Sequence, residues 1–256
     1  MYNMMKIVTW NMRFVYKDGD GINNFVHRAG MVCEKLAVEL PDVITFQEIV
    51  PESLKLLKRM LPEYDFFGHF KEADYVTGGG LFTAVRKESF DIIALETFWL
   101  SETPYTPGTR FKNQSPVPRT CVMTLLRNKI TGELIRVFNI HLDHISEEAR
   151  VHGMKCILEF VKEYNKKISC PVVLMGDFNS SPEDESIELC RKEFKDITEN
   201  IKTTFHGYSG ECEKIDYILL SEEFEGRVKK ADIWDDSSDG IYLSDHYPVY
   251  AEIKNI

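Results

Sequence analysis

The chain has 256 residues, of which 43% are hydrophobic and 28% charged, and its formal net charge is −10 at pH 7. These ordinary globular values exclude collagen-like, mucin-like and low-complexity chains. Proteins that bind long duplex DNA use many Lys and Arg against its phosphates, so the excess of acids disfavours that ligand. A bound metal ion or a local basic patch can still reverse the field within one cleft.

The length predicts one domain over residues 1–256 with a substantial core. No apolar run reaches the length of a membrane span, and residues 1–8 enter a strand-like pattern without the core of a signal peptide. We therefore expect a cytoplasmic protein without a membrane span, and its oligomeric state is left open. The six cysteines are scattered singly, which favours reduced thiols over disulfides or a zinc site.

Strands and helices are expected along the whole chain. A strand at residues 6–11 is followed by a helix at 22–40, a strand at 43–47, a short helix at 53–61, and strands at 64–70, 81–86 and 90–100. A long polar loop then leads to strands at 119–128 and 134–141, a helix at 147–166, a strand at 172–177, a helix start at 181–184, and strands at 214–220, 227–234 and 249–253. Alternating and continuous apolar strands both occur, so two packed sheets with outer helices fit better than one doubly wound sheet.

The stretch VVLMGDFNSSPED places polar side chains at the end of a buried strand. Alternation would point Asp177 and Asn179 the same way, with Phe178 facing the core. Two oxygen-bearing side chains would then share a crevice at the carboxyl end of a strand, where sheet proteins tend to bind ligands. A simple turn is the alternative, because Gly, Asp and Asn are common turn formers.

The same chemistry recurs at other places where buried strands begin or end. The segments are Trp10-Asn11, Gln47-Glu48, Asn139-Ile140-His141-Leu142, Ile215-Asp216 and Ser244-Asp245-His246. Any one of them is explained equally well by a turn or by a hydrogen-bonded core residue. Together they indicate an assembled site.

In this order, and with Gly176 to Asn179, the segments resemble the motifs of the endonuclease/exonuclease/phosphatase superfamily, over Trp10 to Val249. That superfamily includes deoxyribonuclease-I-like nucleases, deadenylases, sphingomyelinases and inositol polyphosphate phosphatases, and Asp143-His144 is similar to a bacterial branch whose members mostly lack an assigned substrate. The resemblance implies an α/β fold of the deoxyribonuclease-I-like kind. This is a four-layered α/β sandwich of two packed mixed β-sheets flanked by helices, with a magnesium-dependent phosphoester site at one end.

The resemblance also implies a metal site. Glu48, helped by Asn11, would hold Mg²⁺, for which Mn²⁺ can substitute, and Asp245 would reach the same ion or a second metal position. Hard oxygen ligands of this kind suit Mg²⁺, which keeps several waters when bound. The metal would neutralise one phosphate oxygen.

Five residues would carry the chemistry by the same resemblance. Asp177 would be the base or orienting acid for in-line attack by water, and Asn179 would hydrogen-bond the phosphoryl oxygens. His141 and His246 would donate hydrogen bonds to the charge of the transition state. Asp216 would orient His246 and favour its protonated ring.

For four further residues the sequence allows two possible roles each. Arg119 and Arg150 are candidate contacts for a phosphate or a leaving group, with solvated surface residues as the alternative. Asp143 and His144 either line the cleft or have purely structural roles.

The resemblance implies a phosphoester substrate, and the acidic surface favours a compact one: a small phosphodiester, a sugar or inositol phosphate, or a headgroup. The alternative is a nuclease acting on abasic-site DNA, RNA ends or single strands, so nucleic acid stays open as a partner. It would need a basic groove bearing aromatic residues. Only one loop could supply that groove, the one with Tyr105, Arg110, Phe111, Lys112 and Arg119. A non-catalytic scaffold would have lost at least one motif residue, yet all are present.

Overall fold

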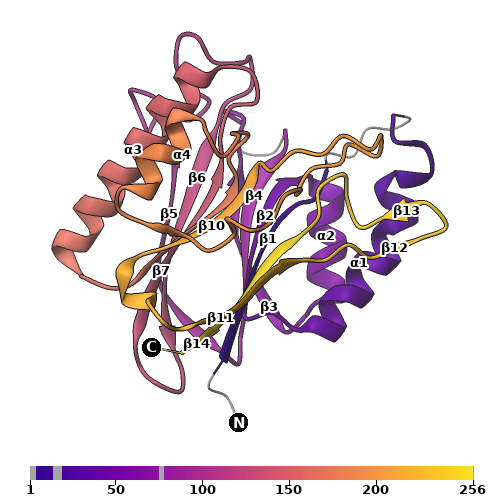
Figure 1. Ribbon diagram of the computed structural model, residues 1–256, viewed down its shortest axis with the longest axis horizontal. Coiled ribbons are helices and arrows are strands. Elements are labelled where there is room, and N and C mark those ends of the chain that lie inside the picture. The colour runs from indigo at the N-terminus through magenta and orange to yellow at the C-terminus, as the bar shows by residue number, and fades with distance from the viewer. Residues whose placement is uncertain (1–3, 14–18, 75–77, 256) are drawn as a thin grey trace.

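Two six-stranded sheets lie at the centre of the computed structural model, which describes residues 4–13, 19–74 and 78–255. Helices α1 (Phe25–Glu39) and α2 (Pro51–Met60) cover the outer face of one sheet. Helices α3 (Glu147–Lys167) and α4 (Glu185–Arg191) cover the outer face of the other (Figure 1). The four-layered α/β sandwich expected from the sequence is therefore confirmed.

The first sheet has the order β11-β14-β1-β2-β4-β3. Its strands are β11 (Val228–Ile233), β14 (Val249–Lys254), β1 (Met4–Asn11), β2 (Val43–Ile49), β4 (Gly80–Arg86) and β3 (Tyr64–Phe70). Strands β1 and β2 run parallel, and the other neighbours run antiparallel. The sheet is mixed, as predicted.

The second sheet has the order β5-β6-β7-β8-β10-β9. Its strands are β5 (Phe90–Trp99), β6 (Thr120–Asn128), β7 (Leu134–His141), β8 (Val172–Asp177), β10 (Asp216–Leu220) and β9 (Lys195–Asp196). Only β7 and β8 form a parallel pair in this sheet. A separate pair, β12 (Ser237–Ser238) and β13 (Ile241–Tyr242), lies beyond α1 (Figure 1).

Some boundaries differ from the sequence prediction. The first helix begins at Phe25 rather than at residue 22, because Asn24 caps it by accepting a hydrogen bond from the Val26 N–H. The helix start expected at residues 181–184 is instead a turn in which the Ser181 N–H donates to the Asp184 carboxylate. Helix α4 follows that turn, and the short strands β9, β12 and β13 were not predicted.

Apolar side chains fill three clusters, one between the sheets and one under each pair of helices. The middle cluster takes residues from both sheets, including Ile7, Val43, Val137, Val173 and Ile218. Alternation along each strand sends the intervening residues to a helical layer. The open end of the middle layer is where its strands change from apolar to polar residues.

Further sequence expectations concern membranes and thiols. Within the described ranges, no helix is both long enough and apolar enough to cross a membrane. All six cysteines are free, as predicted. Residues 1–3, part of the segment in which no signal-peptide pattern was found, lie outside the described residues.

Gly176 is expected to be intolerant of a side chain. Its φ is +156°, and a Cβ would lie 1.9 Å from the Ile140 carbonyl oxygen, across the parallel pairing of β7 and β8. We expect Gly176→Ala to lower the free energy of unfolding in urea by about 3 kcal/mol or more. Gly30→Ala is the matched control, because a methyl group on that exposed helical glycine would have no neighbour within 4 Å and should raise stability slightly. Equal effects of the two changes would contradict this interpretation of Gly176.

Candidate active site

Strand alternation places predicted catalytic side chains at the open end of the layer between the sheets. In β8, Val173 and Met175 face the middle layer, and Asp177 continues on the same side. In β7, Val137 faces that layer, and His141 lies on the same side at the strand end. Because β7 and β8 are parallel and pair His141 with Asp177, the two polar residues arrive together.

The neighbouring strands bring more polar residues to the same edge. Strand β10 is antiparallel to β8 and begins at Asp216, which is paired with Asp177. Strand β1 ends at Asn11, and Glu48 lies near the end of β2, which is parallel to β1. Asp245 comes just before β14, which is antiparallel to β1 and therefore starts at this end. The sequence segments far apart in the chain thus reach one end of the sandwich.

Asp177 is the centre of the site. Its Oδ2 accepts a hydrogen bond of 2.9 Å from Asn11 Nδ2 and lies 3.4 Å from His141 Nε2 and 3.9 Å from His246 Nε2. Burial, followed by the negative charge of Asp216, raises the pKa of Asp177 to about 7. His246 and Asn11 act in the opposite direction. The carboxyl group therefore titrates near neutral pH, where a general base is most effective.

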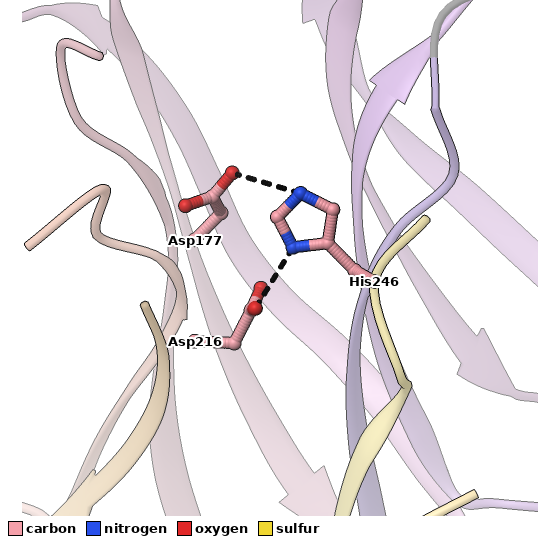
Figure 2. A group of neighbouring side chains, drawn as sticks. All are labelled: Asp177, Asp216 and His246. Carbon is pink, nitrogen blue, oxygen red and sulfur yellow. Dashed lines mark hydrogen bonds and ion pairs between the residues drawn. The ribbon is translucent and has the colours of Figure 1, made fainter. Parts of the chain in front are cut away.

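His246 lies between two carboxylates (Figure 2). Its Nδ1 donates to Asp216 Oδ2 at 2.8 Å, while its Nε2 faces Asp177. Burial alone would lower the pKa of His246, but the charge and hydrogen bond of Asp216, with help from Asp245 and Asp177, raise the pKa to about 10. The ring is consequently an imidazolium at neutral pH, with one N–H held by Asp216 and the other directed at Asp177.

Asp177, Asp216 and His246 are close enough together to surround a metal ion, since their ligand atoms lie within 4.8 Å of one another. A histidine binds a metal only through an unprotonated ring nitrogen. The raised pKa of His246 and its hydrogen bond to Asp216 favour the protonated ring instead. We therefore interpret this trio as a hydrogen-bonded proton-handling group rather than as a metal centre.

The predicted metal ligands Glu48 and Asp245 face a guanidinium group. Arg13 Nη1 lies 3.4 Å from Asp245 Oδ2, and its Nη2 lies 3.2 Å from Asp20 Oδ1. Burial opposes the charge of Arg13, but Asp20, Asp245 and Glu48 together hold its pKa above the usual value. The negative charge of these predicted ligands thus already attracts a cation, the Arg13 guanidinium.

This donor set fits a hard divalent cation. Glu48 is half-buried and adopts a φ of +58°, beside an irregularity in the pairing of β2 with β4, so its side chain leaves the regular strand. Asn11 presents its amide oxygen to the Arg13 N–H at 3.0 Å, on the side of the amide opposite to Asp177. Carboxylate and amide oxygens that attract a cation are the ligands that Mg²⁺ and Mn²⁺ prefer.

Arg119 joins His141, the last residue of β7, to His144 in the loop after that strand. Its guanidinium donates to His141 Nε2 at 2.8 Å and to His144 Nδ1 at 2.7 Å. Burial, followed by the charge of Arg119, lowers the pKa of both rings, and that of His141 falls well below 6.5. Both rings are neutral acceptors here, and Arg119 is itself only 5% exposed. A solvated surface role for Arg119 is excluded by its burial.

Asp143 holds the loop around it. Its carboxylate accepts hydrogen bonds from the Ser115 hydroxyl and from the backbone N–H groups of Ser115, Ile145 and Ser146. Burial opposes ionisation, but these bonds and Arg119 lower the pKa of Asp143. These bonds tie the loop before β6 to the start of α3.

Asn179 and Arg150 lie beside Asp177 and Asp143 with partners of their own. Asn179 has a φ of +48°, so the alternation of β8 does not extend to it, and its Nδ2 donates to the Leu142 carbonyl at 3.0 Å. Its backbone N–H donates to Asp177 Oδ1 at 2.9 Å. Arg150 contacts the Asp184 carboxylate and the Asp143 carbonyl, both at 3.3 Å, and so links α3 to two loops.

Two buried cations near the site were missed from the sequence. Arg28 is 0% exposed, and its guanidinium donates at 2.7 Å to the carbonyls of Met12 and Leu243, which holds together the chain segments that carry Asn11 and Asp245. The sequence feature that could have indicated a buried role for Arg28 is its position, as a charged residue, on the apolar face of a helix. Lys71 directly follows β3. The sequence feature that could have indicated it is the one shared by the other site residues, a polar residue at the end of a strand.

Comparisons with known proteins agree with this arrangement. The structure of an endonuclease/exonuclease/phosphatase from Bacteroides vulgatus has a TM-score of 0.89 and 26% identity, covering 99% of each chain. A mannosyl-6-phosphatase from Bacteroides thetaiotaomicron VPI-5482 has a TM-score of 0.86 and 26% identity, covering 96% of this chain and 98% of that one. Human tyrosyl-DNA phosphodiesterase 2 is 27% identical over 184 residues, which are 69% of this chain.

The matched part of that human relative is 42% of its length, so this chain spans less than half of it. The family model covers far more of the chain described here. The model of the Endonuclease/Exonuclease/phosphatase family matches residues 8–246, which include every motif segment from Trp10-Asn11 to His246. The chain therefore belongs to the Endonuclease/Exonuclease/phosphatase family.

Proposed function

We propose that the chain is a divalent-metal-dependent phosphoester hydrolase in which water attacks an in-line phosphorus, acting on a compact phosphodiester or phosphomonoester. The family gives the general class, hydrolases of phosphoester bonds. One observation carries the finer proposal. Asp177 is a buried acid with a pKa near 7, and it faces the imidazolium of His246.

These two groups have complementary tasks in phosphoester hydrolysis. With a pKa of about 7, Asp177 is largely ionised at slightly alkaline pH and can take a proton from an attacking water, while Asn11 holds its Oδ2. The His246 Nε2–H, 3.9 Å from that oxygen, can donate to the charge that develops on a phosphoryl oxygen. Asp216 keeps the proton on the ring throughout.

Metal dependence is supported by the donor set described above. Asn11, Glu48 and Asp245 would hold Mg²⁺, or Mn²⁺ in its place, close to the Asp177 that Asn11 contacts. When bound, the ion supplies positive charge that polarises the phosphoryl group. Arg28 supports these ligands indirectly through the Met12 and Leu243 carbonyls.

A compact substrate is supported by the loop between β5 and β6. Tyr105 and Phe111, the aromatic residues that could have stacked on nucleobases, pack against Phe160 and His152 of α3. The hollow beside them is lined by three acids, Glu102, Glu159 and Glu163, and by one lysine, Lys155. This excess of acids disfavours a nucleic-acid backbone there and favours a small ester over a polynucleotide.

The remaining expectations stay predictions. We infer that residues 1–256 act as one domain, because both sheets contribute to one shared core. A cytoplasmic location is supported by six free cysteines. Phosphodiesterase activity on DNA is named for a relative, and cleavage of nucleic acid by this chain is therefore an outcome that the experiment below must include.

The experiment is a substrate panel with the purified chain. Bis(p-nitrophenyl) phosphate, p-nitrophenyl phosphate, a sugar 6-phosphate, abasic duplex DNA and short single strands are each incubated with Mg²⁺, with Mn²⁺ or with EDTA. We expect hydrolysis of the compact esters that EDTA abolishes and that either metal restores. Turnover unchanged in EDTA would remove the metal from the proposal, and preferred cleavage of the polynucleotides would replace the proposed substrate class.

A further inference from the structure

A buried polar layer separates the candidate active site from the apolar core between the sheets. It consists of Thr9, Gln47 and Asn139, whose exposed fractions are 1%, 0% and 0%. Strand alternation explains where this layer lies. Thr9 precedes Asn11 by two residues in β1, and Asn139 precedes His141 by two residues in β7, so each lies on the same side as the site residue but closer to the core. The proposed mechanism uses none of the three.

Two amide side chains of this layer join the two sheets. Gln47 of the first sheet donates from Nε2 to Asn139 Oδ1 of the second sheet at 2.9 Å. Asn139 in turn donates from Nδ2 to the backbone carbonyls of Phe46 and Phe82 in the first sheet, both at 3.1 Å. Gln47 and Asn139, called the amide bridge below, therefore hold β7 against β2 and β4. Packed sheets share no backbone ladder, so side-chain contacts of this kind set their relative position.

The amide bridge meets the first sheet where strand pairing becomes irregular. The pairing of β2 with β4 is regular up to Phe46 and then shifts, and Glu48 lies in the shifted part with a φ of +58°. Backbone at such an irregularity is not held by the regular ladder. Gln47 supplies other bonds there, because its Nε2 also lies 3.1 Å from the Thr45 carbonyl oxygen and 3.2 Å from Thr9 Oγ1. The residue directly before Glu48 is thus held by side-chain hydrogen bonds to both sheets.

The amide bridge connects the two halves of the proposed site. On the first sheet it leads directly to Glu48, a proposed metal ligand. On the second sheet Asn139 is followed two residues later by His141, which is paired with Asp177. Buried amides carry a desolvation cost that apolar side chains of the same shape avoid, so stability alone does not explain them. Geometry does, because an error of about 1 Å in the position of reacting groups can lower a rate about 100-fold.

Resting on the hydrolase function proposed above, we propose that Gln47 and Asn139 are positioning residues. They hold the first sheet, with Glu48, at one distance from the second sheet, with Asp177, so that both carboxylates can act on the same phosphorus. The amide bridge acts through Glu48 and lies below the site, on the core side of Asn11 and His141. Its loss should therefore change metal affinity and kcat, and should leave KM nearly unchanged.

Single apolar substitutions test the first part of this proposal. Gln47→Met and Asn139→Leu each remove one partner of a buried hydrogen bond, so each should lower the unfolding temperature by about 5 °C. Each should also lower kcat about 30-fold and weaken Mn²⁺ binding about 10-fold, as expected when a residue that orients a metal ligand is lost. KM should change less than about 3-fold. Rates are measured on the ester that the wild type hydrolyses fastest, and Mn²⁺ binding by titration calorimetry.

The double variant Gln47→Met/Asn139→Leu separates positioning from stability. Replacing both amides leaves neither of them unpaired, so this variant should unfold at a higher temperature than either single variant. Its kcat and Mn²⁺ affinity should stay as low as theirs, because apolar side chains can pack at more than one distance. Ile135→Ala is the matched control. This 3% exposed residue faces the same layer farther along β7, and its truncation should cost at least as much stability while kcat and Mn²⁺ affinity change less than about 2-fold.

Three results would overturn the proposal while leaving the hydrolase function intact. They are recovery of kcat or Mn²⁺ affinity together with stability in the double variant, single variants that lose stability alone, and a loss of kcat in Ile135→Ala as large as in Asn139→Leu. If the single variants do not fold, Thr9→Val removes one acceptor of Gln47 without a change of shape. It should lower kcat about 3-fold, and an unchanged kcat would then count against positioning. If the wild type hydrolyses no ester, it is the hydrolase function that fails, and unchanged Mn²⁺ affinity in the variants refutes the proposal separately.

Discussion

Asp177→Asn is expected to lower kcat by about 10³-fold or more on any phosphoester that the chain hydrolyses. Asparagine has nearly the same shape as aspartate, but its amide cannot accept a proton from water at neutral pH. The carboxylate is also one of the two acids that flank His246. Steady-state rates with saturating metal and substrate measure the effect. Retained turnover would remove Asp177 from the proposed mechanism.

Measuring the stability of Asp177→Asn distinguishes a loss of catalysis from a loss of the folded state. Because burial and Asp216 raise the pKa of Asp177 from 3.8 to about 7, folding disfavours the ionised carboxylate. The resulting destabilisation is absent below about pH 4, grows from pH 4 to pH 7 and stays constant above that. Asp177→Asn should therefore unfold at a higher temperature than the wild type at pH 8 in the absence of metal, and the gain should shrink at pH 5. A lower unfolding temperature at pH 8 would show that the carboxylate supports the fold.

Asp177 could be predicted from the sequence because a buried acid that costs stability indicates a functional role. A buried strand that ends in Gly-Asp-Phe-Asn has no packing reason to place an acid there, so Asp177 stood out. Alternation also assigned Phe178 to the core correctly, where it is 0% exposed and packs near Tyr217. It did not describe Asn179, because the strand ends at Asp177 and the backbone turns to a positive φ.

Contacts between segments that are distant in the sequence could not be predicted from strand alternation or other local patterns. For Arg119 the sequence leaves two roles open, a contact to the phosphate or leaving group and a solvated surface residue. Its burial, and its contacts with His141 and His144, come from a segment distant in the sequence. Lys71 gave no signal beyond its position after a strand. Its burial, beside a Trp99 side chain whose Nε1 donates to the Lys71 carbonyl, depends on how the two sheets pack, which local periodicity does not encode.

Asp216→Asn is expected to change the pH dependence of the reaction more than the affinity for metal. Burial pulls the pKa of His246 down, and Asp216 is the main group that raises it to about 10. Without that carboxylate the pKa of His246 falls, because burial then opposes only the weaker influences of Asp245 and Asp177. We expect kcat to fall about 100-fold at pH 8 and less at pH 6. Rates from pH 6 to pH 10, with metal titrations at each end, measure both quantities.

The interaction of Asp216 with His246 also predicts how stability depends on pH. A histidine whose pKa is raised by folding stabilises the protein fully below its unfolded pKa of about 6.5, and this contribution is lost as the pH rises through about 10. Asp216→Asn should therefore cost most stability near pH 6, and the difference from the wild type should narrow towards pH 10. A rate loss that is the same at every pH, or a large loss of metal affinity, would instead make Asp216 a metal ligand. Since its Oδ1 has no hydrogen-bond partner among the described residues, that outcome would have a structural basis, and the trio around His246 would have to be read as a metal centre after all.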